Sequence, residues 1–282
     1  PIMMWYDKRP QDICDRLNAD YGDEIYRVTG MYARPMFSAP KMRWLKENYP
    51  AVYEQSHKLA GIQDYLIFLL TGEWVTDLTF ASRTNLLDLN SNCWSERMLE
   101  IFGVDEQKLC RLVEPGSEVG VLKESWQNRG FDRKTKIYTA GGDQQCSAIG
   151  QGLLASGKIG INNGTASYVA VCSRSRLEDK EKVIHVNKGA ALGTWIMEAS
   201  NMGTGSVYDW MRKILFDFEE DTVSIEAMNE ALNNSTAGAD GIIAWPYLAG
   251  KGMPDWDSHK AGCLLNLKLS STKENIARAF LE

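Results

Sequence analysis

Residues 136–145 of this 282-residue chain read Lys136-Ile-Tyr-Thr-Ala-Gly-Gly-Asp-Gln-Gln145. The first five residues predict a β-strand, Gly141-Gly142 a turn, and Asp143 the start of a helix that runs to Ile149. A strand that leads through glycines into a helix is typical of α/β sheets, in which ligands bind at the carboxyl ends of the strands. We therefore expect an α/β fold with Asp143 at the mouth of a cleft.

Two roles are open to Asp143. A carboxylate at a helix start commonly acts as the N-cap and stabilises the helix by about 1 kcal/mol. The local pattern by itself favours this capping role. The same carboxylate could also accept a proton from a bound hydroxyl, since the glycines allow a ligand to approach the backbone closely. The two roles are compatible.

The remaining sequence predicts a change of secondary structure along the chain. Before residue 136 it is mainly helical; after residue 158 strands dominate, and a domain boundary is expected near Gly152. The predicted helices are Ile13–Leu17, Ala39–Glu47 with Ser38 as its cap, Ile62–Leu70, Asp105–Leu112, Gly203–Leu215 and a last one from Ser271. The predicted strands are Ile159–Asn162, Tyr168–Cys172, Ala190–Ala199 and Ile242–Leu248, and the last of these is expected to be buried.

Two glycine-containing segments could bind phosphate. Asn163-Gly164-Thr165-Ala166 joins two predicted strands, and its amides and hydroxyl could hold phosphate oxygens. Pattern alone favours a plain hairpin turn there. Gly152-Leu-Leu-Ala-Ser-Gly157-Lys158 has the spacing of a P-loop, but Ile159 stands where magnesium binding needs Ser or Thr. We interpret that second segment as a helix that ends at Gly157.

Two further groups of residues could bind or cleave a sugar. Trp5-Tyr-Asp-Lys-Arg9 combines an aromatic ring, a carboxylate and a guanidinium, although an ordinary surface ion pair explains the segment equally well. Asp255 and Asp257 flank Trp256 and are the only suggestion of the carboxylate pair that a glycosidase requires. Nothing else in the sequence supports a glycosidase.

Composition excludes several other classes. The net charge of −6 argues against a nucleic-acid partner, and the longest apolar run, Leu66–Leu70, is too short to span a bilayer. The six cysteines lack Cys-x-x-Cys spacing and the three histidines are scattered, so we expect reduced thiols, a cytoplasmic protein and no protein-bound metal site.

Many motifs occur in the order found in the FGGY family of carbohydrate kinases, and over nearly its whole length the chain resembles that family. The motifs that carry the resemblance are Trp5-Tyr-Asp-Lys-Arg9, Phe37-Ser-Ala-Pro-Lys41, Trp44-Leu45, Asp64-Tyr65, Leu70-Thr-Gly-Glu73, Thr76-Asp77, Ala81-Ser82, Leu87-Asp88, Trp94, Gly142-Asp-Gln-Gln145, Gly164-Thr165, Pro246-Tyr-Leu-Ala-Gly250, Pro254, Trp256-Asp257 and Gly262.

The resemblance implies an actin-like, ribonuclease H-like α/β kinase of two domains. Residues 1–152 would be the remainder of an N-terminal sugar-binding domain, and residues 153–282 the first part of a C-terminal nucleotide-binding domain. It also implies ATP with Mg²⁺ as cofactors and a small sugar or polyol as substrate. The resemblance is compatible with a homodimer.

The resemblance also assigns roles to single residues. Asp143 would be the general base and Gln144 a sugar ligand. Trp5, Asp7 and Arg9 would lie near the sugar. Gly164 and Thr165 would contact the phosphates of ATP, and Gly205 and Asp209 would line the nucleotide site.

The chain departs from the family pattern in three places. No Asp-x-Gly-Thr phosphate loop precedes Pro1, and no glycine-rich adenosine motif occurs before Glu282. We therefore expect a partial chain with no appreciable kinase activity by itself. Lys251-Gly-Met253 stands where many members of the family carry Glu-Arg-Thr.

The resemblance implies a pentulose such as D-xylulose as the substrate. The Phe37–Lys41 and Trp5–Asp7 segments resemble xylulokinases, and Met36 stands where glycerol kinases place a tyrosine. Gln144-Gln145 and Ala81–Thr84 resemble glycerol kinases, so glycerol or another polyol is the next choice. A catalytically silent sugar-binding module is the alternative from another functional class.

Overall fold

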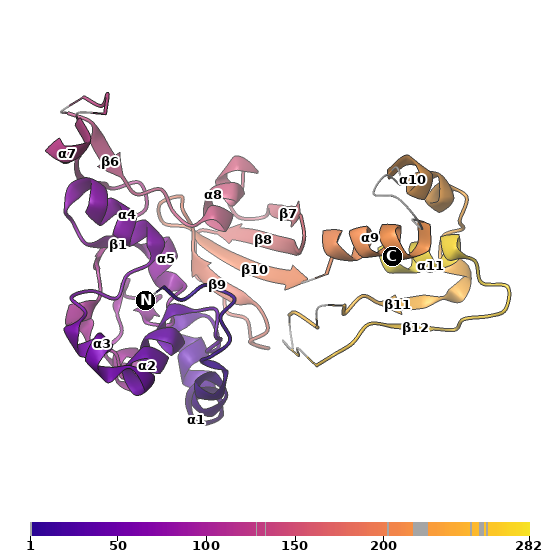
Figure 1. The fold of residues 1–282 in the computed structure, drawn as a ribbon, viewed down its shortest axis with the longest axis horizontal. Coiled ribbons are helices and arrows are strands. Elements are labelled where there is room, and N and C mark those ends of the chain that lie inside the picture. The colour runs from indigo at the N-terminus through magenta and orange to yellow at the C-terminus, as the bar shows by residue number, and fades with distance from the viewer. Residues whose placement is uncertain are drawn as a thin grey trace. The chain divides into compact units, whose positions relative to one another are not determined.

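The structure, a computed structural model, describes residues 2–127, 129–132, 134–201, 203–216, 225–248, 250–253, 257 and 259–282. The chain forms two compact units (Figure 1). Pro1–Gly160 and Ala170–Glu198 make the first unit, and Ile161–Val169 and Ala199–Glu282 make the second. The chain thus passes between the units near residues 160, 169 and 198.

The first unit is mainly helical in its first half. The largest apolar core of this unit lies where α1, α2 and α6 meet, and its side chains include Ile13, Leu17, Met98 and Phe102. The helices of this unit are α1 (Gln11–Thr29), α2 (Ser38–Asn48), α3 (Pro50–Gln55), α4 (Ile62–Thr71), α5 (Leu78–Ser82), α6 (Glu96–Phe102), α7 (Glu124–Gln127) and α8 (Asp143–Gly150), with a 3₁₀ turn at Glu106–Lys108.

Short paired strands connect these helices. β1 and β4 are parallel, with Val75 opposite Arg111, whereas β5 and β6 are antiparallel, as are β2 and β3. These strands are β1 (Val75–Asp77), β2 (Leu87–Asp88), β3 (Cys93–Trp94), β4 (Arg111–Val113), β5 (Glu118–Val121) and β6 (Lys136–Tyr138).

A four-stranded sheet has the order β7-β8-β10-β9. Its strands are β7 (Ile159–Asn163), β8 (Ser167–Ser173), β9 (His185–Lys188) and β10 (Trp195–Asn201). Within the first unit, β9 docks on the end of α1, because the N–H of Val186 donates to the carbonyl of Gly30. Gly30 has a φ of +75°, and a Cβ there would lie 2.3 Å from the Val186 carbonyl oxygen. Only glycine suits both demands.

The second unit packs three helices beside a β-hairpin. Val207, Met211, Met228, Leu232 and Ala277 form its main apolar core. Its elements are α9 (Gly205–Met211), which continues as a π-helical turn over Arg212–Phe216, α10 (Ile225–Asn233), α11 (Lys273–Leu281), and the antiparallel pair β11 (Ile243–Trp245) and β12 (Cys263–Leu265).

Several predicted elements agree with the structure. The helices predicted at Ile13–Leu17, Ala39–Glu47 and Ile62–Leu70 are present as α1, α2 and α4. Three predictions were wrong. Residues 105–112 hold only a 3₁₀ turn and the start of β4; α8 ends at Gly150, well before Gly157; and β11 is not buried, since Ile243 is 49% exposed.

Two predicted helix starts are also displaced. Phe37, not Ser38, is the N-cap of α2, and Thr272 caps α11 by accepting the N–H of Asn275. Each helix start is displaced by a single residue, which is within the fraying of helix ends.

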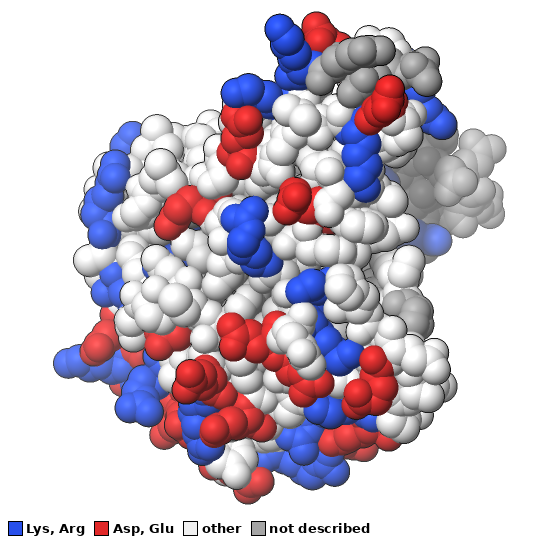
Figure 2. All heavy atoms as spheres, turned by 90° about the vertical axis from the view of Figure 1, so that its left-hand side faces the viewer, with Lys and Arg blue, Asp and Glu red and all other residues white. Residues whose placement is uncertain are grey.

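Charges are spread over the surface of the first unit. Figure 2 shows Lys and Arg interleaved with Asp and Glu over one face. Arg97 pairs with Glu24 at 3.1 Å, and Lys136 pairs with Glu118 at 2.8 Å. Exposed pairs of this kind contribute about 0–1 kcal/mol each. No helix in the described part of the chain is both long enough and apolar enough to cross a membrane.

One buried carboxyl group makes the stability of the first unit pH-dependent. Asp64 on α4 is 7% exposed, and its Oδ2 accepts the N–H of Gly61 at 2.8 Å. Burial raises the pKa of Asp64 from 3.8 to about 6. Because its folded pKa is the higher one, the stability it contributes is present below about pH 4 and is lost as the pH rises through 6.

We predict that Asp64→Asn stabilises the protein relative to wild type as the pH rises. Asn can still accept the Gly61 N–H but cannot ionise, so its relative gain between pH 4.5 and 7.5 should be about 2 kcal/mol. Urea unfolding of both proteins at the two pH values measures it. Asp12→Asn, at an exposed position in α1, should show no such change. An equal difference at both pH values would contradict the raised pKa.

Candidate active site

Asp143 is held on a strand–turn–helix unit, as the sequence predicts. β6 leads through Gly141, whose φ is +137°, to Gly142 and then directly into α8. A Cβ on Gly141 would lie 3.0 Å from the Cβ of Ala190 and 3.4 Å from the Sγ of Cys146. Both the dihedral angle and the crowding require glycine, so the turn has little freedom to shift.

The carboxylate of Asp143 is exposed to solvent. The N-cap of α8 is Gly142, and no side chain caps the helix. Asp143 is the first helical residue, and its Oδ1 accepts the N–H of the adjacent Gln144 at 2.8 Å. The capping role that the local pattern favours is therefore wrong, and the carboxylate is accessible to a ligand.

Two buried residues that the sequence assigned no role hold the turn before Asp143. The N–H of Gly142 donates to Thr79 Oγ1 at 2.8 Å, and Thr79 Oγ1 donates to Asp77 Oδ1 at 2.5 Å. Both Asp77 and Thr79 are fully buried. Asp77 was quoted in the family motif Thr76-Asp77, but nothing local connects it with a turn more than 60 residues away.

The two glutamines after Asp143 differ in environment. Gln144 is partly exposed, consistent with the ligand role predicted for it. Gln145 is 2% exposed and packs beneath the turn, where a Cβ on Gly142 would lie 2.4 Å from its Oε1. Among the described residues, Gln145 Nε2 has no hydrogen-bond partner. One glutamine is thus accessible to ligand and the other belongs to the interior.

Asp7 and Arg9 form an ion pair, whereas the contact found for Trp5 among the described residues is with Tyr6. Arg9 donates from Nε and Nη2 to the carboxylate of Asp7, and this pairing lowers the pKa of Asp7 to about 2. The Arg9 guanidinium also lies 4.3 Å from the ring centre of Trp44. Trp5 is 61% exposed and makes an edge contact with Tyr6 at 5.6 Å. An exposed indole suits the face of a sugar ring, and a paired acid and base suit its hydroxyls.

Lys41 is a further charged group near this cluster. Its Nζ donates to the carbonyl of Met36 at 2.8 Å, and burial lowers its pKa to about 8, an effect that Asp7 partly offsets. The sequence signal for Lys41 was its place in Phe37-Ser-Ala-Pro-Lys41, to which no role was assigned.

In the second unit, the predicted Gly-Thr turn sits on the start of α9. Gly205 N–H donates to the Gly164 carbonyl at 2.9 Å, and Ser206 donates to the Thr165 carbonyl through its N–H at 3.3 Å and its hydroxyl at 3.2 Å. Thr165 itself is exposed. Gly164, Thr165 and Gly205, which were predicted separately, therefore form one cluster.

Asp209 lies one turn further along α9. Its side chain is 70% exposed and pairs with Arg212 at 3.7 Å. It shares the helix with Gly205 but does not contact the Gly-Thr turn through any hydrogen bond found among the described residues.

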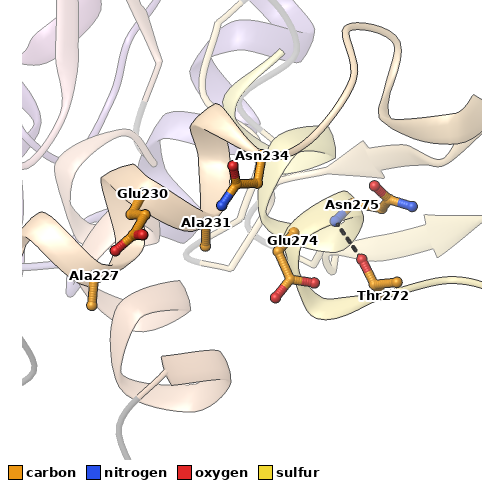
Figure 3. Close-up of a pocket in the computed structure, with 7 residues that line it drawn as sticks. All are labelled: Ala227, Glu230, Ala231, Asn234, Thr272, Glu274 and Asn275. Atoms are coloured by element: carbon orange, nitrogen blue, oxygen red, sulfur yellow. Dashed lines mark hydrogen bonds between the residues drawn. The ribbon is translucent and has the colours of Figure 1, made fainter.

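The second unit also has a pocket away from these residues. It lies between α10 and α11 (Figure 3). Its volume is about 520 Å³. Ala227 and Ala231 form its small-residue floor, and Glu230, Asn234 and Glu274 carry the polar groups around it. None of the predicted site residues lines it, so it was not found from sequence.

Two other predictions concern metals and glycosidases. Among the described residues, no group of three His, Cys, Asp or Glu side chains could hold a metal ion. Of the carboxylates considered for a glycosidase, Asp255 lies outside the described residues. The Oδ1 of Asp257 accepts the N–H of His259 at 2.9 Å.

Family models match both parts of the chain. Residues 1–150 match the N-terminal domain of the FGGY family of carbohydrate kinases, and residues 160–282 match its C-terminal domain. The chain belongs to this family. The resemblance inferred from the motifs is thereby confirmed.

Individual FGGY kinases are similar over nearly the whole chain. A glycerol kinase from Thermococcus gammatolerans is 29% identical over 289 residues, and a xylulose kinase from Bacillus subtilis is 29% identical over 282 residues; each alignment covers 99% of this chain and 56% of the relative. The crystal structure of ligand-bound xylulose kinase from Lactobacillus acidophilus aligns with a TM-score of 0.91 at 28% identity, over 99% of this chain and 56% of that one.

These FGGY relatives confirm the predicted actin-like two-domain α/β fold class. The chain spans little more than half the length of the curated relatives it matches. The roles of the individual site residues remain predictions.

We predict that Gly205→Ala destabilises the second unit. A Cβ at position 205 would lie 2.4 Å from the carbonyl oxygen of Gly164, which is backbone and cannot swing away, so we expect a loss of about 1–3 kcal/mol. Gly164→Ala is the matched control, because its Cβ would meet only the Ala166 oxygen at 3.8 Å. Urea unfolding measures both. Equal stabilities for the two variants would show that the turn does not rest on α9.

Proposed function

We propose that this chain carries the sugar-binding part and a portion of the nucleotide-binding part of an ATP-dependent carbohydrate kinase. The observation that supports this most strongly is the exposed carboxylate of Asp143 on a fixed glycine turn, in a chain of the FGGY family. Residues 1–152 are proposed as the sugar domain and residues 153–282 as the start of the nucleotide domain.

Asp143 acts as the general base in this proposal. A sugar hydroxyl is a weak nucleophile, and a carboxylate within hydrogen-bonding reach can accept its proton while the phosphoryl group is transferred. Asp143 is accessible, its Oδ2 is not engaged by any hydrogen bond found in the described part of the chain, and its backbone is held by Gly142. Gln144, partly exposed beside it, would orient the sugar hydroxyls.

Trp5, Asp7 and Arg9 are proposed as further sugar contacts. The exposed ring of Trp5 offers an apolar face, and the pairing with Arg9 keeps Asp7 ionised at any physiological pH, because its pKa is about 2. Arg9 has donors beyond those that Asp7 engages. Such a pair can accept from and donate to neighbouring hydroxyls in a fixed geometry.

The Gly164-Thr165 turn, Gly205 and Asp209 are proposed to line the ATP site. Thr165 is exposed, and its hydroxyl makes no hydrogen bond found in the described part of the chain, so it could donate to a phosphate oxygen. The contact of Gly205 with the Gly164 carbonyl fixes the turn against the start of α9. Magnesium, when bound with ATP, would neutralise phosphate charge. It usually keeps several waters and so does not require a cluster of three protein ligands, and none is found among the described residues.

D-Xylulose or another pentulose is the proposed substrate, with glycerol next. Relatives of both kinds are 29% identical to the chain. Met36 supports the pentulose, because glycerol kinases place a tyrosine at this position. We also propose that the protein is cytoplasmic.

We predict that Asp143→Asn lowers phosphoryl transfer at least a hundredfold, because the amide cannot accept the proton. The measurement is ADP release by the native gene product that contains this chain, with D-xylulose, other pentuloses, gluconate and glycerol as acceptors. Asp12→Asn is the matched control, since Asp12 is also an exposed acid in the first turn of a helix.

Calorimetry and a glycoside-hydrolysis assay, run beside the ADP-release assay, separate the rival functions. Sugar binding by calorimetry without ADP release from wild type would identify a silent binding module. Glycoside hydrolysis that survives Asp143→Asn and disappears in Asp257→Asn would identify a glycosidase instead.

A further inference from the structure

The turn that carries Asp143 is tied to a buried carboxylate on a different segment. We propose that Asp77 and Thr79 are positioning residues for Asp143: they hold the backbone of Gly142 and so fix where the reactive carboxylate stands. This inference rests on the proposed role of Asp143 as the base, and it gives a function to two residues that do not themselves touch the substrate.

Gly142, Thr79 and Asp77 form a hydrogen-bond relay, and the donors and acceptors available determine the direction of each bond in it. Gly142 can only donate through its N–H, so Thr79 Oγ1 must accept there, at 2.8 Å. The single hydroxyl hydrogen of Thr79 is then free for Asp77 Oδ1, at 2.5 Å. The N–H of Thr79 donates to the same oxygen at 2.9 Å. A hydroxyl that donates to a carboxylate becomes a better acceptor, so the bond to Gly142 is strengthened.

The second oxygen of Asp77 is also occupied. Gln63 Nε2 on α4 donates to Asp77 Oδ2 at 2.8 Å, so the carboxylate is held from both sides. No Lys, Arg or His side chain in the described part of the chain forms an ion pair with Asp77, although the residue is fully buried. Burying a carboxylate that has only neutral hydrogen-bond donors costs free energy. A buried polar network whose hydrogen bonds are satisfied holds its members in one geometry.

The relay acts at the one residue that controls the turn. Gly142 is clamped at its N–H by Thr79 and at its carbonyl by the first helical bond, from the N–H of Cys146 at 2.9 Å. Asp143 is the next residue, and the N–H of Gln144 is the hydrogen-bond partner found for its carboxylate among the described residues. The position of the carboxylate therefore depends on the backbone, and the backbone depends on Thr79. A displacement of about 1 Å can lower a rate by roughly a hundredfold.

The test compares three single substitutions at two threonines in and just after α5. Thr79→Val removes the relay at constant shape, Thr79→Ser keeps the hydroxyl, and Thr84→Val is the matched control. The Thr84 hydroxyl likewise donates to a carbonyl, that of Ala81 at 2.7 Å, and accepts an N–H, that of Leu86 at 3.0 Å, but it does not contact the turn.

Two readouts are needed. In steady-state kinetics, Thr79→Val should lower kcat about tenfold to a hundredfold and leave the KM for ATP unchanged. Thr79→Ser should restore kcat to within about threefold of wild type, and Thr84→Val should have a kcat near that of wild type. Hydrogen exchange of residues 139–146 should be faster in Thr79→Val only. Asp77→Asn, which retains shape and one acceptor, should give an intermediate loss if Thr79→Val does not fold.

The two ideas fail differently. Absence of phosphoryl transfer by wild type to any acceptor would refute the proposed function. Hydrogen exchange at residues 139–146 that is the same in Thr79→Val and Thr84→Val would overturn the positioning role, and so would equal kcat values for those two variants.

Discussion

The candidate site depends on one hydrogen bond, from the backbone N–H of Gly142 to the hydroxyl of Thr79. It joins the end of the β6 segment to the start of α5, which lies 63 residues earlier in the chain. Asp77 makes this bond directional because its carboxylate takes the hydroxyl hydrogen. The exposed Asp143 then projects from a backbone that cannot relax independently of the core. The proposed base is exposed, and buried neighbours hold the backbone that carries it.

The same core region holds a second buried polar network. Arg83, at the end of α5, pairs with Glu198 on β10, and Asn187 on β9 donates to the same Glu198 carboxylate at 3.2 Å. Glu198 is 4% exposed and Asn187 is fully buried. Leaving one such charge unpaired in the interior is strongly destabilising, so the network favours a single arrangement of α5 against these strands. Asp77 caps α5 at its other end, and both networks therefore hold the same short helix in place.

The second unit uses close backbone approach instead of a side-chain relay. Gly205 brings the start of α9 against the Gly164 carbonyl, and a methyl group there would overlap the carbonyl oxygen. The amides at the start of α9 are thus engaged by the turn, whereas the hydroxyl of Thr165 remains exposed. In both units glycine is required by contact with a distant segment, and not by the local turn alone.

Family and fold class could be read from the sequence alone, because many motifs occur in one order and because apolar spacing in segments such as Ile62–Leu70 acts over a few residues. Gly141-Gly142-Asp143 likewise predicted its own turn and helix. Only the tertiary structure decided that Asp143 is exposed rather than capping, that Thr79 holds Gly142, and that Gly205 rests on Gly164. These features arise from packing between segments far apart in the chain, and no local propensity encodes which distant atom will meet a given amide.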